Sequence, residues 1–283
     1  MCLPAIKYLQ TLNIPMILMG RAWIHDLLKD LDIPKKTWPK SHIQAIQTLR
    51  AIPYKNLLLF TNSFSSAMIA ITAGKKAIGY AKDCRGPLLY RAIPKPKNYH
   101  ETTLFNRLTK TCLNVFYPQI QIDEFSQIPE INLKQLLINK SLPTSYIVLC
   151  PFAHGKNRQG QSKKWPHWQA LFEKLKHLHP IICPGPNEIE EAERQFPKNH
   201  ILQGLSLYDY LQVLSQAQCV IANDSGPLHM AAALNCPTIG LFGATCEKRT
   251  APRRALILGH LGQWPDIETV FYHINEIILH YDA

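Results

Sequence analysis

The sequence lacks any apolar run close to the ~18 residues that a membrane-spanning helix needs. Its apolar runs, such as 146–150 and 219–222, have the length of strands. The opening residues, MCLPAIKYLQ, contain no basic leader followed by a long apolar core, so we predict no signal peptide. These absences argue against an integral membrane protein and predict a cytoplasmic one.

Paired cysteines and clustered metal ligands are also missing. The eight cysteines form no C-x-x-C pair, and several lie inside apolar runs, so we expect free, buried thiols in a reducing compartment. Because His, Cys and carboxylate residues do not cluster at the spacing of a metal site, we predict no metal and no other cofactor. A nicotinamide oxidoreductase is disfavoured, since no predicted strand is followed by G-x-G-x-x-G.

The positive charge is distributed unevenly along the chain. The net charge is +11, from 31 Lys and Arg against 20 Asp and Glu, and residues 1–145 account for all of it with 19 basic and 8 acidic residues. A basic surface attracts anions, so the first half is either merely basic or binds nucleic acid, an anionic membrane surface or a phosphorylated substrate. We find no nucleic-acid-binding motif and therefore predict no nucleic-acid partner.

Strand-length apolar runs alternate with helical patterns along the whole chain. Strands are predicted at 15–19, 56–60, 76–80, 146–150, 181–183, 219–222 and 238–242, with helices such as 42–51, 65–73, 168–178 and 228–234 between them. Residues 82–98 are rich in Pro, Lys and Arg and are predicted to form an irregular loop. A further helix is expected at 133–138, before a linker.

This alternation predicts an α/β protein whose parallel sheets are covered by helices on both faces. The length of 283 residues fits about two domains. We predict one Rossmann-like domain over 1–142, a second over 146–265, and a closing helix in 266–283 that could pack back on the first domain. Ligands in such folds bind at the carboxyl ends of strands, so the cleft between the domains is the expected site.

The most informative segment is CVIANDSGPLHMAAALNCPTIGLFGAT, residues 219–245. Its pattern predicts a strand, a tight turn, a helix, a second strand and a glycine turn. Asp224 or Ser225 suits the helix N-cap, and Gly226 allows a ligand to approach the backbone closely. The free amides and the positive dipole end of this helix form an anion site, with His229 on its first turn.

A second set of amides follows the next strand at residues 243–245, where Gly243 and Thr245 flank the turn. Two anion-suited turns at neighbouring strand ends fit a diphosphate. The alternative stays open for each residue alone, because Asp224 could be only a cap and His229 only a packed histidine. The combination at this spacing favours the binding function.

This segment resembles glycosyltransferase family 9, the ADP-heptose:lipopolysaccharide heptosyltransferases, whose pattern is D-[TS]-G-x-x-H-x-A-A-A-L-x-x-P, a strand, and G-x-T. Residues 151–166, PFAHGKNRQGQSKKWP, are similar to the P-G-A…K-x-W-P segment of the family and end in Lys164-Trp165-Pro166. Residues 182–188, ICPGPNE, resemble its G-S-x-x-E turn. Residues 60–74, FTNSFSSAMIAITAG, look like the heptosyltransferase II version of P-N-S-F-x-S-A.

The resemblance implies a GT-B fold, with two Rossmann-like domains facing across a cleft, and an inverting transfer of heptose from ADP-heptose to the lipopolysaccharide inner core. In the second domain it implies a donor site with Lys164 at the ADP phosphates and Glu188 at the ribose. The residues Asp224, Ser225, Gly226, His229, Gly243 and Thr245 complete that donor site. Taken alone, Lys164 could be a solvated lysine and Glu188 a carboxylate of a first helical turn.

The first domain is implied to face the acceptor, with Asn62, Ser63 and Arg85 on the acceptor side. An acceptor of the lipid A and Kdo type is anionic, which fits the basic first half and a peripheral position at the inner face of the inner membrane. The sequence leaves the oligomeric state open, and we take a monomer as the working expectation.

The general base of the reaction has no counterpart in this sequence. Relatives begin with a strand and a turn ending in Gly-Asp, and that Asp is the proposed base, whereas residues 1–4 here align with the helix that follows. We therefore expect the first strand and the base to be missing. A start codon placed too late, a degenerate homologue and a different base stay open, and the alternative function is a homologue that only binds a nucleotide-sugar.

Overall fold

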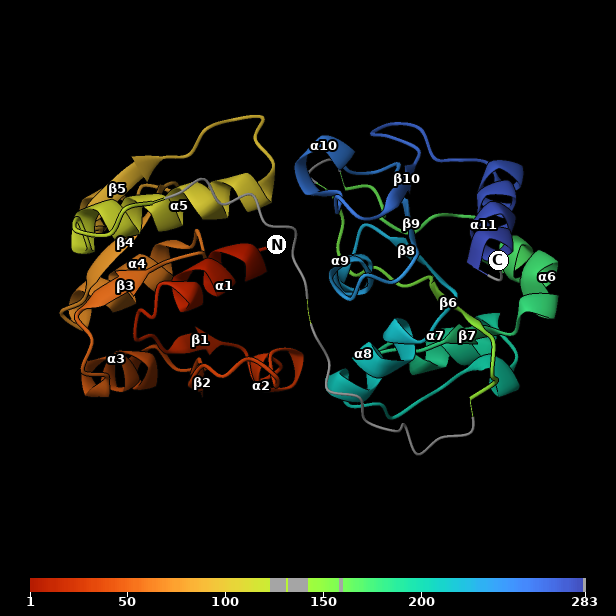
Figure 1. Cartoon of the computed structure of the whole chain (residues 1–283), viewed down its shortest axis with the longest axis horizontal. Helices are drawn as coiled ribbons and strands as arrows, with labels where there is room; N and C mark the ends of the chain where they lie inside the picture. Colours follow the sequence, from red (N-terminus) through yellow and green to blue (C-terminus); the bar gives the residue numbers. More distant parts are fainter. Residues whose placement is uncertain (123–130, 132–141, 158–159, 282–283) are drawn as a thin grey trace. The chain divides into compact units, whose positions relative to one another are not determined.

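The computed structural model describes residues 1–122, 131, 142–157 and 160–281. The chain divides into two compact units, shown in Figure 1. One is made of Met1–His25 and Leu31–Pro129, and the other of Asp26–Asp30 and Glu130–Ala283. The predicted helix at 133–138 lies outside the described residues.

The first part of the chain contains short parallel strands with helices between them. In chain order the elements are α1 (Leu3–Thr11), β1 (Leu18–Gly20), α2 (Ile24–Leu27), β2 (Lys35–Thr37), α3 (His42–Ala51), β3 (Asn56–Leu58), α4 (Phe64–Thr72), β4 (Lys76–Ala81), η1 (Gly86–Leu88), β5 (Arg91–Pro94) and α5 (Glu101–Phe116). Strand β1 pairs with β2, and β4 lies between β3 and β5, all in parallel.

Strand β4 is buried on both faces, as its apolar sequence requires. Ile78 and Tyr80 point to one side and pack on Leu104 and Leu108 of α5. Ala77 points to the other side, toward small alanines of α4. Helix α4 begins at Phe64 because the Ser63 hydroxyl accepts a hydrogen bond from the Ser66 amide at 3.3 Å.

The prediction of an irregular loop over 82–98 is wrong. The structure contains the 3₁₀ turn η1 and the strand β5, which pairs with β4 from Ile78↔Arg91 to Ala81↔Pro94. Strand β5 lies at the edge of its sheet, and Ile93 is its buried residue. An edge strand needs few apolar residues and tolerates a proline at its end, so the composition alone does not reveal it.

The second unit contains a parallel sheet in the order β10-β9-β8-β6-β7. Its elements are β6 (Ile147–Cys150), α6 (Trp168–Leu175), η2 (Lys176–Leu178), β7 (Pro180–Ile182), α7 (Ile189–Gln195), η3 (Lys198–His200), α8 (Leu207–Ser215), β8 (Cys219–Asn223), α9 (Gly226–Ala233), β9 (Thr238–Leu241), α10 (Glu247–Thr250), β10 (Leu256–Leu258) and α11 (Ile267–Tyr281). The chain runs outward from β6 to β7 and then returns to the other side of β6 as β8. The sheet therefore reverses its winding between β6 and β8.

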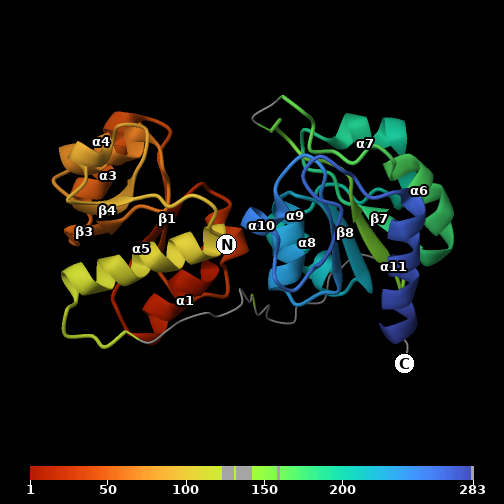
Figure 2. The same ribbon diagram turned by 90° about the horizontal axis from the view of Figure 1, so that it is seen from above.

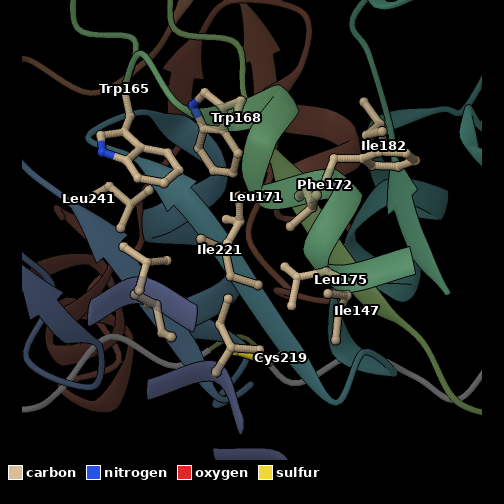
Figure 3. Packing of buried hydrophobic residues seen from close by; sticks show 14 of the residues in the cluster. Ile147, Trp165, Trp168, Leu171, Phe172, Leu175, Ile182, Cys219, Ile221 and Leu241 are labelled. Carbon is tan, nitrogen blue, oxygen red and sulfur yellow. The ribbon is translucent and has the colours of Figure 1, made fainter. Parts of the chain in front are cut away.

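Apolar side chains pack on both faces of this sheet, as strand β8 illustrates. Its side chains alternate, so that Cys219 and Ile221 enter one buried cluster and Val220 and Ala222 enter the other. Helices α6 and α11 cover the first face and α8 and α9 the second (Figure 2). Figure 3 shows the first cluster, in which Trp165 and Trp168 lie beside Leu171 of α6.

The closing helix packs on the second unit. Val270 and Ile274 of α11 are fully buried in the cluster of α6 and the sheet, and Lys174 of α6 pairs with Glu268. The structure thus assigns α11 to the second unit. The apolar residues of α11 and α6 pack in the same buried cluster, which removes both from water.

The cysteines are free thiols, and Cys112, Cys150, Cys219 and Cys236 are buried. Burial raises the pKa of Cys150 and of Cys236 to about 12, which keeps both protonated at neutral pH. Within the described residues, no group of three His, Cys, Asp or Glu side chains is arranged to hold a metal ion. In the same part of the chain, no helix has the length and apolarity needed to cross a membrane.

Candidate functional site

The site lies at the carboxyl ends of the strands in the second unit, where the sheet reverses its winding. Strands β6 and β8 are neighbours, in register from Ile147↔Cys219 to Cys150↔Ala222. The loops that follow them begin at Pro151 and Asp224. In open α/β sheets, this is where the two loops diverge and leave room for a ligand.

A buried asparagine, Asn223, joins these loops at the end of β8. It is fully buried, and its Nδ2 donates to the backbone oxygens of Pro151 at 2.9 Å and Cys150 at 3.3 Å. Its Oδ1 accepts the amide hydrogen of Trp165 at 2.9 Å. Sequence analysis missed this residue, although a polar residue that ends the apolar run CVIA was a usable signal.

Helix α9 starts directly after this asparagine and has no side-chain cap. Ser225 is the N-cap residue, as predicted, but its hydroxyl donates to the Asn223 carbonyl at 3.2 Å instead of accepting from the helix. Pro227 lies in the first turn. The first amides of a helix have no intrahelical acceptor, so an uncapped start leaves donors and a positive dipole end for an anion.

Asp224 brings two basic side chains to the start of this helix. Its carboxylate is 8% exposed, and its oxygens lie 3.7 Å from Lys163 Nζ and 3.9 Å from His229 Nε2. A nearly buried carboxylate needs such partners to offset its lost hydration. Asp224 and His229 are thus together, as the sequence predicts, and the carboxylate positions both basic groups beside the uncapped helix.

The lysine at this place is Lys163, and Lys164 points elsewhere. Lys164 Nζ lies 2.7 Å from both carboxylate oxygens of Glu191 on α7, and it lies over the ring of Phe152. The hydrogen bond from Lys164 lowers the pKa of Glu191. The spacing K-x-W-P, counted strictly back from Trp165, already indicates Lys163, so a usable signal was present in the sequence.

Glu188 lies at the end of the neighbouring strand β7, in the loop before α7. Its Oε2 accepts the Gly185 amide hydrogen at 2.8 Å, and its Oε1 lies 2.7 Å from Nε2 of His154. His154 belongs to the loop after β6. The pair therefore bridges two adjacent strand ends, with a carboxylate that is 15% exposed and a histidine that is largely exposed.

The indole of Trp264 packs against the glycine turn that follows β9. A Cβ atom added to Gly243 would fall within the ring of Trp264. The amide of Gly262 donates to the Gly243 oxygen at 2.7 Å, so the whole 259–265 loop lies on this turn. Gly243 is therefore required by internal packing, which is a different reason from the ligand contact that the sequence implied. Thr245 lies on the same turn.

The predicted acceptor-side residues lie in the first unit, around the start of α4. Arg85 is fully buried, and its Nε donates to the Tyr80 carbonyl at 2.8 Å. Its Nη1 reaches the Ser63 carbonyl at 3.2 Å, and its Nη2 lies 3.5 Å from Asn62 Oδ1. The structure thus brings Asn62, Ser63 and Arg85 together, with the guanidinium holding the turn between β3 and α4.

Comparison with known proteins identifies the family of this chain. The model of glycosyltransferase family 9 (heptosyltransferase) matches residues 35–267. The chain belongs to this family. Lipopolysaccharide heptosyltransferase 2 of Escherichia coli strain K12 is 25% identical over 235 residues, which cover 72% of this chain and 64% of that protein. The chain spans less than two thirds of the length of the curated relatives that it matches.

Solved structures place this family 9 chain in the GT-B fold, with parallel sheets in two Rossmann-like domains. The structure of E. coli ADP-heptose lipopolysaccharide heptosyltransferase II matches with a TM-score of 0.81 and 18% identity, over 100% of this chain and 96% of that one. E. coli heptosyltransferase WaaC with ADP matches with a TM-score of 0.72 and 19% identity, over 98% and 95%. The predicted fold class is confirmed.

We predict that Asn223→Leu destabilises the second unit of this family 9 chain. Leucine keeps the volume but leaves the Trp165 amide and the Pro151 carbonyl without partners, and each buried unpaired group costs ~1–3 kcal/mol. The free energy of unfolding should fall by about 2–4 kcal/mol in urea denaturation followed by tryptophan fluorescence. The exposed Asn199→Leu is the control and should stay within about 0.5 kcal/mol of the parent. Equal losses in both variants would contradict the bridging role of Asn223.

We also predict that Gly243→Ala destabilises the chain, because the added methyl group overlaps the Trp264 indole. Overpacking of this kind costs ~1–3 kcal/mol. Gly226→Ala is the matched control, since its Cβ would meet the Met230 methyl at an ordinary 3.6 Å. Thermal unfolding should separate the two variants, and equal melting temperatures would argue against the packing of Trp264 on this turn.

Proposed function

We propose that the chain is an inverting glycosyltransferase that moves a heptose from ADP-heptose to the inner core of lipopolysaccharide. The observation that carries this proposal is the cluster of Asp224, Lys163 and His229 at the uncapped start of α9. It supports a site for a diphosphate at the strand ends where the winding of the sheet reverses.

The donor would bind across the carboxyl ends of four neighbouring strands, β9, β8, β6 and β7. Lys163 would supply positive charge, and His229 and the first amides of α9, next to Ser225 and Gly226, would supply hydrogen-bond donors for the two phosphates. The turn of Gly243 and Thr245 would add donors at the next strand end, and Glu188 would accept from the ribose hydroxyls. A relative of the same fold, WaaC, has been solved with ADP, which supports this choice of nucleotide.

The chemistry follows from the charges that develop. The bond between the anomeric carbon and the phosphate oxygen breaks, and its electron pair leaves with the ADP. The fixed amides, the helix dipole and Lys163 stabilise that growing negative charge. The acceptor hydroxyl attacks from the opposite face of the sugar, so the configuration at the anomeric carbon is inverted, and its proton passes to a general base. The aspartate expected in that role has no counterpart in this sequence, so the proposed reaction requires another base.

The acceptor side would belong to the first unit. The +11 charge of residues 1–145 supports an anionic acceptor with phosphates and carboxylates, at the inner face of the inner membrane of a cytoplasmic enzyme. Asn62 and Ser63 would contact this acceptor. Arg85 is fully buried, so we place it in a supporting role in which it holds their turn.

Replacing each of the two adjacent lysines by alanine, in separate variants, tests the donor site. Lys163→Ala should weaken ADP binding about tenfold or more, because a charge-assisted contact to phosphate is worth about 1.5–3 kcal/mol. Lys164→Ala, the neighbouring control, removes the pair with Glu191 and should change the dissociation constant less than about twofold. Isothermal titration calorimetry measures both. A larger effect of Lys164→Ala would assign the phosphate contact to Lys164, as the family resemblance implies, and not to Lys163.

Turnover tests the reaction itself. With ADP-heptose and Kdo-lipid A we expect release of ADP and one added heptose, detected by mass spectrometry, with inverted anomeric configuration by NMR. Binding of ADP-heptose with no transfer would contradict the enzymatic proposal and leave the second candidate, a protein that only binds a nucleotide-sugar.

A further inference from the structure

The loop after β6 forms a small hairpin ahead of Lys163. Lys156 and Ser162 form an antiparallel bridge, and the Asn157 amide donates to the Gln161 carbonyl at 2.9 Å. The Gly160 amide donates to the Asn157 carbonyl at 3.0 Å. The hairpin leads directly into the lysine and then into Trp165.

The side chain of Asn157 links this hairpin to the glycine turn, 87 residues further along the chain. Its Nδ2 donates to the Ala244 carbonyl at 2.8 Å and to Gln161 Oε1 at 2.7 Å. Its Oδ1 accepts the Gln161 amide hydrogen at 2.9 Å. Both donors and the acceptor of the amide group are thus in use, which fixes its orientation.

This contact also sets the direction of the next peptide group. In a trans peptide the carbonyl and the following N–H point in opposite directions. The chain contains no cis peptide in its described residues. Because the Ala244 carbonyl points toward Asn157, the orientation of the peptide group between Ala244 and Thr245 is fixed.

Lys163 therefore lies between two asparagine anchors. On one side, Asn157 fixes the hairpin to Ala244, and on the other, Asn223 accepts the Trp165 amide hydrogen at 2.9 Å. Without the first anchor, the segment would still be held by Trp165, by the pair of Lys164 with Glu191 and by the 3.7 Å pair of Lys163 with Asp224, but not by the glycine turn. Fixing both ends lowers the conformational entropy that the loop loses when a ligand binds.

We propose that Asn157 is a positioning residue, which ties the Lys163 loop to the Gly243–Thr245 turn so that both act on the same diphosphate. This inference rests on the proposed donor site. It assigns a function to a residue that does not itself contact the ligand.

The test compares three single variants by calorimetric titration with ADP. Asn157→Ala should weaken ADP binding about tenfold, since the lysine and the turn are no longer held together. Asn157→Asp keeps the acceptor oxygen but loses the donors and sets a carboxylate against the Ala244 carbonyl, so its loss should be larger. Gln161→Ala is the control, because it leaves the bond from Asn157 to Ala244 in place, and its affinity should stay within about twofold.

A double-mutant cycle separates positioning from mere stabilisation. In the Lys163→Ala background, Asn157→Ala should cost at least about threefold less affinity than in the parent, because the lysine that it positions is absent. Additive losses would overturn the positioning role. Hydrogen exchange of residues 156–163 and 243–246 gives a readout that needs no ligand, and it should become faster at both segments in Asn157→Ala.

The outcomes distinguish this inference from the proposed function. If the parent chain binds no ADP, the proposed function fails, and the positioning role fails with it. If the parent and Asn157→Ala bind ADP equally well, only the positioning role fails. Unchanged exchange at 243–246 in Asn157→Ala would likewise overturn the link between the two loops.

Discussion

The candidate site depends on one buried amide. Asn223 occupies the last position of β8, where the sheet stops supplying backbone partners, and its side chain replaces them for the loop after β6 and for Trp165. Buried backbone groups that lack partners are costly, so these bonds hold the loop in one conformation. The location of Lys163, two residues before Trp165, follows from this constraint, as does the place where α9 begins.

Charge balance is the second constraint on the site. A carboxylate beside a proposed diphosphate is unfavourable by itself, yet Asp224 is nearly buried there. Its two neighbours, Lys163 and His229, offset this cost, and the carboxylate in turn orients both basic groups. A ligand phosphate would then meet side chains that are already ordered, which reduces the entropy lost on binding.

Much of the fold could be predicted from the sequence, because local patterns report burial. The sequences CVIA (219–222) and KAIGY (76–80) predict buried parallel strands, and each lies within an observed strand, β8 and β4. Strand β5 escaped prediction because an edge strand with one buried residue has no apolar run. The structure brings the predicted Asp224 and His229 together beside Ser225, while the neighbours of Lys164 and the packing of Gly243 depend on residues distant in the chain.

The sequence by itself therefore determined the α/β class and the family, and it indicated the strand ends now proposed for the donor, since these follow from periodicity and from short contiguous motifs. The K-x-W-P spacing indicates Lys163, and the tertiary structure decided the partners of the two adjacent lysines, since Glu191 and Asp224 come from different elements. It also decided that Trp264 covers Gly243 and that α11 packs on α6. Such contacts are set by packing between distant segments, which no local pattern records.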